Sequence, residues 1–374
     1  MDQQNYRILL IEAFDHLEVT NRWQMFQLSD WLSPEFEDEE EWEKIESFEM
    51  DTIPNRSAIT SWKAYLEQPE TREFLRQFDL IILVTVGRRP QWFAKALTGH
   101  RYWLVLHNLA DWRGSPLALN SPWALLSYAR ERWSLAAKKQ LLANAERVVV
   151  PLESMLPLAR RIAGPDRPLW LPFATNPDSA ATSPTKEKTF SKASLQSPFR
   201  IFVPGKVTDQ LKDYQQLAEA LLEYPVDGPA LEISLAGRLA EPRWRDLLAG
   251  VSGPFTIRCW DDGLSEKQFE EELGKTHLVL SPLHQRRQRG PYWETTGVTR
   301  TSGAVFDAIA ACKPLLTPDW HPILGKDHLV YGSTEELTAI LLTKAKEGFI
   351  PGEWPEFDQQ LWRERWLSAI RKPL

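Results

Sequence analysis

The stretch of the sequence that is best suited to hold a phosphate group begins at Ser302 and Gly303. These small residues precede Ala304–Cys312, where apolar side chains recur at the three- and four-residue spacing of a helix. The first turn of a helix has backbone N–H groups without partners and carries the positive end of the helix dipole, so it attracts anions. Asp307, one turn further along, could accept hydrogen bonds from the hydroxyl groups of a ribose or another sugar. The alternative is an ordinary strand–loop–helix unit that binds no ligand.

Two lysines that follow another apolar run could neutralise a diphosphate. Gly205 and Lys206 come directly after Arg200–Val203, and Lys212 lies where the next helix is expected to start. Cations at a strand end and at a helix start can stabilise the negative charge of a departing nucleoside diphosphate. Gly237 ends the following apolar run in a similar turn. Without the stretch described above, both lysines would be interpreted as ordinary surface residues.

Three polar residues and one tryptophan elsewhere could complete a site of this kind. His107 ends an apolar run, although a single histidine is more often structural. Asp15 and His16 follow the first apolar run of the chain, and either could act as a general base. Trp260 could stack on a nucleotide base, and packing in the core would explain it equally well.

Short apolar runs alternate with helical patterns along the chain, which predicts an α/β protein with mostly parallel sheets. Ligands of such sheets bind outside the carboxyl ends of the strands, where the residues above would lie. Residues 20–32 have a helical pattern, and residues 284–293 resemble a basic loop that could meet phosphate or an acceptor. The expected strands include Tyr6–Ala13, Asp79–Val86, Tyr102–Leu106, Arg147–Pro151, Pro168–Phe173, Arg200–Val203, Leu231–Ala236, Phe255–Cys259 and His277–Ser281.

The composition divides the chain into two similar halves. Residues 176–199 are rich in Ser, Thr, Pro and Lys and have no apolar period, which is typical of a linker. We therefore expect an N-terminal domain over residues 1–175 and a C-terminal domain over residues 200–355. A last helix, within residues 356–374, is expected to pack back on the N-terminal domain.

The overall composition argues against several classes of protein. A net charge of −7 over 374 residues argues against a dedicated nucleic-acid-binding protein. The two cysteines fit a reducing, cytoplasmic compartment and exclude a disulfide framework or a cysteine-based zinc site. No uninterrupted run of about 18 apolar residues is visible, so we expect neither a signal peptide nor a membrane-spanning helix. No cluster of His and Asp indicates a bound metal.

The segment Asp307–Leu315 resembles the donor-site motif of GT-B glycosyltransferases, above all the family-4-like ones. In that family a Gly-rich turn leads into E-A-[MLI]-A-x-G-x-P-[VL], and the segment here reads DAIAACKPL in the same register. The sequence departs from the pattern because the second glutamate is Asp307 and the glycine is Cys312. The first glutamate of the usual E-x7-E pair would fall at Thr299, and the nearest acid upstream is Glu294.

The resemblance implies where a nucleotide-sugar donor would bind. Gly205, Lys206 and Lys212 match the G-[RK] and lysine elements whose cations clamp the donor diphosphate in the family. Gly237 looks like the first glycine of the family's h-x-G-x-G turn, although the second glycine is absent. The pair Ser302-Gly303 is similar to the one that divergent GT-B families carry before the donor-site helix.

The resemblance also suggests roles for the remaining candidates. Trp260 stands where family members pack the nucleotide base. His107, within Leu104–Asn108, resembles the V-x-H-[DN] element whose histidine faces the donor sugar across the cleft. Asp15 and His16 lie where acceptor loops are found, so either would be the general base if the reaction inverts the anomeric centre.

The fold implied by this family is GT-B: two Rossmann-like domains, one for the acceptor and one for the donor, with parallel sheets facing a central cleft. The implied activity is that of a hexosyltransferase of polysaccharide biosynthesis. It would move a sugar from a nucleotide diphosphate sugar to a hydroxyl of a saccharide or lipid-linked acceptor. Such enzymes need no metal, because lysines and helix dipoles replace it, so we expect no cofactor besides the donor substrate. Because Thr299 replaces a glutamate, an inactive homologue that serves as a scaffold or partner subunit is an alternative, and so is a GT-B-fold nucleotide-sugar epimerase.

The helix predicted near Pro122–Leu142 could rest on an anionic membrane beside a lipid-linked acceptor, at the inner face of that membrane. A solvated helix face is the alternative. The residues concerned are Trp123, Arg130, Arg132, Trp133, Lys138 and Lys139.

Overall fold

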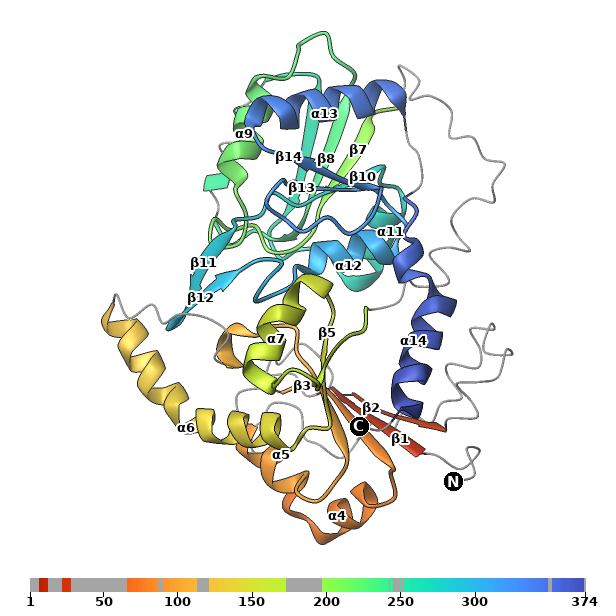
Figure 1. The fold of residues 1–374 in the computed structure, drawn as a ribbon. Coiled ribbons are helices and arrows are strands. Elements are labelled where there is room, and N and C mark those ends of the chain that lie inside the picture. The colour runs from red at the N-terminus through yellow and green to blue at the C-terminus, as the bar shows by residue number, and fades with distance from the viewer. Residues whose placement is uncertain are drawn as a thin grey trace.

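The computed structural model describes residues 7–12, 22–27, 66–86, 90–112, 121–172, 197–241, 243–244, 250, 252–348 and 352–372. Two β-sheets, each accompanied by helices, lie one above the other in Figure 1. We call the part up to residue 172 the N-terminal half and residues 197–348 the C-terminal half. Strands and helices alternate in both halves, which confirms the predicted α/β class.

The first sheet contains β1 (Arg7–Glu12), β2 (Arg22–Gln27), β3 (Leu80–Thr85), β4 (Tyr102–Val105), β5 (Arg147–Val150) and β6 (Pro168–Trp170). Its strand order is β2-β1-β3-β4-β5-β6, and all strands except β2 run parallel. β2 pairs antiparallel with β1 from Arg22 opposite Glu12 to Gln27 opposite Arg7. The helix predicted over residues 20–32 is therefore wrong at this strand, because pairing with β1 outweighs the local helical pattern.

Helices pack on both faces of the first sheet, and its central strands are buried. Ile81 and Leu83 of β3 pack against a core shared with helices of the same half, whereas Leu80 and Ile82 belong to a second core on the opposite face. The helices of this half are α4 (Pro69–Leu75), α5 (Pro90–Ala96), η2 (Ala110–Trp112), α6 (Pro122–Asn144), η3 (Glu153–Met155) and α7 (Leu156–Ala163). Within the part of the chain that the structure describes, none of the helices has both the length and the apolar character to cross a bilayer.

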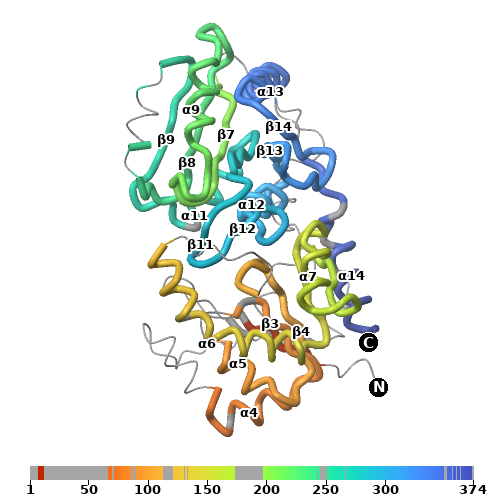
Figure 2. Tube along the Cα trace, turned by 60° about the vertical axis from the view of Figure 1, so that its left-hand side comes forward, coloured from red at the N-terminus to blue at the C-terminus, as the bar shows by residue number. Residues whose placement is uncertain are grey.

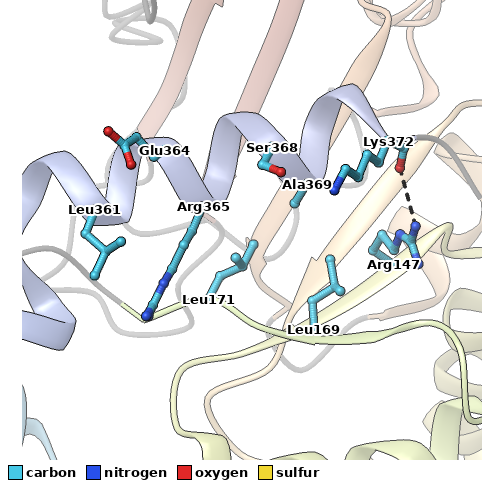
Figure 3. A pocket seen from close by; sticks show the side chains of 9 residues that line it. All are labelled: Arg147, Leu169, Leu171, Leu361, Glu364, Arg365, Ser368, Ala369 and Lys372. Carbon is cyan, nitrogen blue, oxygen red and sulfur yellow. Dashed lines mark hydrogen bonds between the residues drawn. The ribbon is translucent and has the colours of Figure 1, made fainter.

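The second core of the first sheet is covered by the last helix of the chain, α14 (Gln359–Arg371). Asp358 begins it by accepting hydrogen bonds from two backbone N–H groups of the first turn. Trp366 of α14 stacks on Trp103 of β4, with ring centroids 6.2 Å apart. Figure 3 shows the groove between α14 and β6, in which Arg147 donates a hydrogen bond to the carbonyl of Lys372.

The second sheet contains β7 (Phe199–Val203), β8 (Leu231–Arg238), β9 (Phe255–Trp260), β10 (Leu278–Leu280), β13 (Leu315–Pro318) and β14 (His328–Tyr331). Its order is β14-β13-β10-β7-β8-β9, and all pairs are parallel. The chain first builds outward from β7 to β9 and then returns to build outward from β10 to β14. This is a doubly wound sheet, and its switch point lies between β7 and β10.

Helices pack on both faces of the second sheet. They are α9 (Tyr214–Leu222), α11 (Glu266–Gly274), α12 (Gly303–Ala310) and α13 (Thr334–Glu347), and η4 (Pro355–Phe357) follows. α9 and α13 share one core, and α11 and α12 share the core on the other face. α12 ends at Ala310, and two residues later Cys312 has a positive φ of 49°, a backbone conformation that residues with a side chain rarely adopt.

A two-stranded hairpin projects from the second sheet toward the N-terminal half. Its strands are β11 (Arg286–Arg289) and β12 (Tyr292–Thr295), joined by Gly290 and Pro291, and Gly290 has the positive φ that such a turn requires. The expectation of a loop over residues 284–293 is therefore wrong. Figures 1 and 2 both show the hairpin beside α6, and a Cβ atom added at Gly290 would lie 3.9 Å from the Cβ of Ser127.

Candidate functional site

The candidate site lies at the carboxyl ends of β7 and β10, on either side of the switch point. Lys212, from the loop after β7, pairs with Leu283, from the loop after β10, in an isolated antiparallel bridge. The next residue, Asp213, donates its backbone N–H to the carbonyl of Pro282 at 2.6 Å. Ligands of doubly wound sheets bind at such a point, because the loops on either side lead away in opposite directions.

Two glycines bring the loop after β7 against the end of β8. Gly205 has a φ of +85°, which favours glycine. A Cβ atom added at Gly237 would lie 2.2 Å from the carbonyl carbon of Gly205 and 2.5 Å from the backbone nitrogen of Lys206. The loop after β7 and the end of β8 therefore touch through their backbones, and only glycine fits at position 237. Lys206 itself is exposed.

Lys212 and Asp307 form the main pair of opposite charges in the site. Lys212 is 4% exposed, and its ammonium donates a hydrogen bond to the carbonyl of Pro204. Burial lowers the pKa of Lys212 to about 7, and the negative charge of Asp307 opposes this shift. Burial likewise raises the pKa of Asp307 to about 6, opposed by Lys212. Each group thus has a pKa close to 7, and a charged ligand nearby would change its protonation state.

The first turn of α12 is open to a ligand. Ser302 is the N-cap residue, and it is buried, but its side chain accepts no capping hydrogen bond from the helix. Gly303, the first helical residue, is exposed, and a Cβ atom added there would meet nothing within 4 Å. The helix start therefore combines backbone N–H groups, the positive end of the dipole and free space.

The N-terminal half contributes His107, which follows β4. Its carbonyl accepts a hydrogen bond from the backbone N–H of Thr301 at 3.2 Å, so it lies directly beside the start of α12. Burial lowers the pKa of its imidazole, and a hydrogen bond with the backbone of Val84 partly opposes this shift. His107 is therefore neutral at pH 7 and lies next to the loop that leads to Ser302.

Trp260 has a different environment from the other candidates. It ends β9, the edge strand of the second sheet. The guanidinium of Arg258 lies 5.1 Å from the centre of its ring, and Arg258 also pairs with Glu232 and Glu272. One face of the ring is thus covered within the protein, and stacking of a nucleotide base on it stays a prediction. Asp15 and His16 lie outside the described residues.

Thr299, which stands where the GT-B motif has its first glutamate, forms hydrogen bonds with the neighbouring backbone. Its hydroxyl accepts a hydrogen bond from the backbone N–H of Thr295 at 2.7 Å and donates one to the carbonyl of the same residue at 3.1 Å. The side chain is buried. It therefore closes a turn, and its oxygen has no spare proton for a ligand.

Glu294 has a larger role in the structure than the sequence indicated. It has no exposed surface, and its carboxylate is bound by Arg287 at 2.5 Å, Arg300 at 3.2 Å and Arg289 at 3.4 Å. Burial raises the pKa of this carboxyl group, but the charges of Arg287 and Arg300 and the hydrogen bond from Asn108 together hold it below the usual range. Within the segment expected to meet phosphate or an acceptor, Arg287 and Arg289 are thus engaged with this carboxylate, whereas Arg286 lies over the ring of Trp293. The sequence contained one clue, because a Gly-Pro turn places Arg287 opposite Glu294.

No group of three or more His, Cys, Asp or Glu side chains that could hold a metal ion occurs among the described residues. The expectation that the reaction needs no metal stays a prediction.

Comparisons with known proteins bear on the fold. No protein-family model matches the chain, and no curated protein matches it. Among solved structures, it is similar to Anabaena HepE in complex with UDP, with 12% identity, 80% of each chain covered and a TM-score of 0.52. It is also similar to a glycosyltransferase from Rickettsia africae, with 13% identity, 88% of this chain and 86% of that chain covered, and a TM-score of 0.50. The likeness confirms the GT-B fold, two Rossmann-like halves whose parallel sheets face each other.

Proposed function

We propose that the protein is a glycosyltransferase that moves a sugar from a nucleoside-diphosphate sugar to a hydroxyl of a saccharide or lipid-linked acceptor. The observation that carries the proposal is the pair Lys212–Asp307 at the switch point where α12 presents its open first turn. A lysine with a pKa of about 7 would gain its full charge when a diphosphate binds beside it. The structure of HepE, which has a similar fold, contains UDP, and this supports a nucleoside diphosphate as the ligand.

In this proposal the donor diphosphate lies between the first turn of α12 and the lysines. Backbone N–H groups near Ser302 and Gly303 bind phosphate oxygens, and Lys212 and Lys206 neutralise the charge that develops on the leaving group. Asp307 accepts hydrogen bonds from the ribose hydroxyl groups. Trp260 stacks on the base.

The sugar of the donor would face the N-terminal half in this proposal. His107 is neutral at pH 7, and its one ring N–H is donated to the backbone of Val84. The other ring nitrogen can therefore accept a hydrogen bond from a sugar hydroxyl without adding a positive charge. If the reaction inverts the anomeric centre, Asp15 or His16 removes the proton from the acceptor hydroxyl.

We further propose that transfer needs no metal ion, because the cations of the site and the helix dipole stabilise the leaving diphosphate. EDTA should leave the activity intact. Activity that is lost with EDTA and restored by manganese or magnesium would contradict this mechanism.

Isothermal titration calorimetry with a panel of nucleoside diphosphates tests the proposed donor site. Lys212→Ala should weaken binding by about 1.5–3 kcal/mol, the size of a charge-assisted hydrogen bond. Lys267→Ala, which removes an exposed lysine on α11, is the matched control and should bind normally. Unchanged affinity of the Lys212 variant, or no binding by the native protein, would contradict the proposal.

The engaged side chain of Thr299 favours one second candidate, an inactive homologue that binds the nucleotide but transfers nothing. Incubation with a panel of nucleotide sugars, with and without acceptors, separates the possibilities. Transfer or hydrolysis indicates an enzyme, conversion of the free nucleotide sugar to an epimer indicates an epimerase, and nucleotide binding without turnover indicates a scaffold.

We also propose that α6 contacts an anionic membrane near a lipid-linked acceptor. Trp123, Leu125 and Leu126, near its start, are 77%, 51% and 60% exposed beside the basic hairpin. Such aromatic and aliphatic side chains insert at a lipid surface, and arginines attract anionic headgroups. Flotation with vesicles that contain anionic phospholipid tests the contact, and binding that survives Trp123→Ser with Leu126→Ser would contradict it.

A further inference from the structure

The two halves of the molecule are joined by main-chain hydrogen bonds next to the candidate site. The backbone N–H of Leu109 donates to the carbonyl of Thr299 at 2.5 Å, and the N–H of Thr301 donates to the carbonyl of His107 at 3.2 Å. Between them Asn108 and Arg300 form an antiparallel bridge. The segment after β4 thus pairs, strand to strand, with the segment that leads into α12.

The side chain of Glu294 binds the side chains of both residues of this bridge. The amide of Asn108 donates a hydrogen bond to one carboxylate oxygen of Glu294 at 2.6 Å, across 186 positions of sequence. Arg300, the bridge partner of Asn108, binds the other oxygen at 3.2 Å, and Arg287 binds it at 2.5 Å. The carboxylate therefore holds both strands of the bridge, one from each half.

The burial of Glu294 makes this contact costly to open. A carboxylate without exposed surface is stable only while hydrogen bonds and opposite charges replace its water. The arginines all belong to the C-terminal half, whereas Asn108 is the partner supplied by the N-terminal half. Separation of the halves would remove Asn108 and admit water around the cluster. Asn108 is itself oriented, because its side-chain oxygen accepts a hydrogen bond from the backbone N–H of Ala110 at 2.9 Å.

We infer that Glu294 is a positioning residue that holds the two halves closed before any ligand binds and so fixes His107 beside the start of α12. It acts through Asn108 and Arg300 and does not touch the donor. The expected effect on kcat rests on the proposed function, whereas the geometric part, the expected distance between the halves, does not. A further hydrogen bond between the halves, from the hydroxyl of Ser154 to the carbonyl of Gly297 at 2.5 Å, supports the same closed arrangement.

The distance between the halves tests the geometric part. Spin labels at Arg161→Cys and Lys346→Cys, both exposed positions, report that distance in a background from which Cys259 and Cys312 have been removed. The labelled parent should show one narrow distribution that UDP does not change. Glu294→Gln removes the charge, and Asn108→Ala removes the bond between the halves together with the local bond from Ala110. Each variant should broaden the distance distribution. The control is Glu272→Gln, because Glu272 is also a mostly buried carboxylate but pairs with Arg258 inside one half, and it should change nothing.

The kinetics separate a positioning role from a merely structural one. Loss of positioning should lower kcat at least tenfold while the donor KM changes less than threefold, because the donor contacts belong mainly to the C-terminal half. A merely structural residue would lower the melting temperature and leave kcat per folded molecule unchanged. If Glu294→Gln does not fold, Asn108→Ala decides.

The inference would be overturned if both variants kept a distance distribution as narrow as that of the labelled parent. It would also be overturned if the parent's distance distribution were broad without ligand, whether or not UDP then narrowed it. Absence of transferase activity would count against the proposed function, while the distance measurement would still decide on the closed arrangement.

Discussion

Nucleoside-diphosphate binding should weaken as the pH rises from 7 to 9, because Lys212 loses its proton in that range. Its pKa in the free protein is about 7. A diphosphate beside the ammonium raises this pKa, because an anion favours the charged form. The complex therefore binds more protons than the free protein above pH 7, and the affinity falls as the pH increases.

The size of the effect follows from the lowered pKa of Lys212. With a value of about 7, about half of the molecules carry the charge at pH 7, about a tenth at pH 8 and about a hundredth at pH 9. If only the charged form binds, the Kd rises about 50-fold from pH 7 to pH 9, or about 2.3 kcal/mol. Asp307, with a pKa of about 6, stays ionised in this range, and so does a terminal phosphate with a pKa of about 6.

Isothermal titration calorimetry in buffers of different ionisation enthalpy measures both the affinity and the protons taken up. We expect an uptake that approaches one proton per nucleotide at pH 8. Lys212→Arg keeps its charge at every pH and should remove the pH dependence, whereas Lys212→Met should bind weakly throughout. A constant Kd without proton uptake in the native protein, together with weak binding by Lys212→Met, would refute the argument from burial.

Three further predictions concern the backbone around the site. Gly303→Val should abolish nucleotide binding with little change in melting temperature, because a side chain there meets only open space; calorimetry on the folded variant checks this, and full affinity would contradict it. Gly237→Ala should lower the free energy of unfolding by about 2 kcal/mol or more in urea titrations, since its Cβ would lie 2.2 Å from the backbone of Gly205. Cys312→Gly should raise the free energy of unfolding by about 0.5–1 kcal/mol by relieving a φ of 49°. Cys312→Ala keeps the Cβ atom and should not raise the free energy of unfolding. An equal increase in both variants would therefore contradict the reasoning.

The sequence predicted well those features that depend on neighbouring residues. The helix that starts after Ser302 and the strand Arg200–Val203 follow from local apolar spacing, and both are present. The motif also suggested one site for Lys212 and Asp307, and the structure brings their charges together. Whether that site binds a nucleotide is still a prediction.

The sequence could not predict features that depend on pairing between distant segments. β2 forms because β1 offers a complete edge, and nothing in residues 20–32 alone reveals this. From the sequence, Glu294 is only the acid nearest to a missing glutamate, because its partner Asn108 lies 186 positions away. The hairpin around Gly290 could have been recognised from its Gly-Pro turn, but a run of arginines favoured a solvated loop.

The position of α14 has a consequence for how the protein is made. Trp366 of this helix covers a face of the first sheet that includes Ile8 and Trp103. During translation, residues 7–170 leave the ribosome well before residues 359–371. That apolar face therefore stays uncovered while the entire C-terminal half is synthesised, and such surfaces recruit chaperones or aggregate. The N-terminal half completes its core only after α14 has left the ribosome.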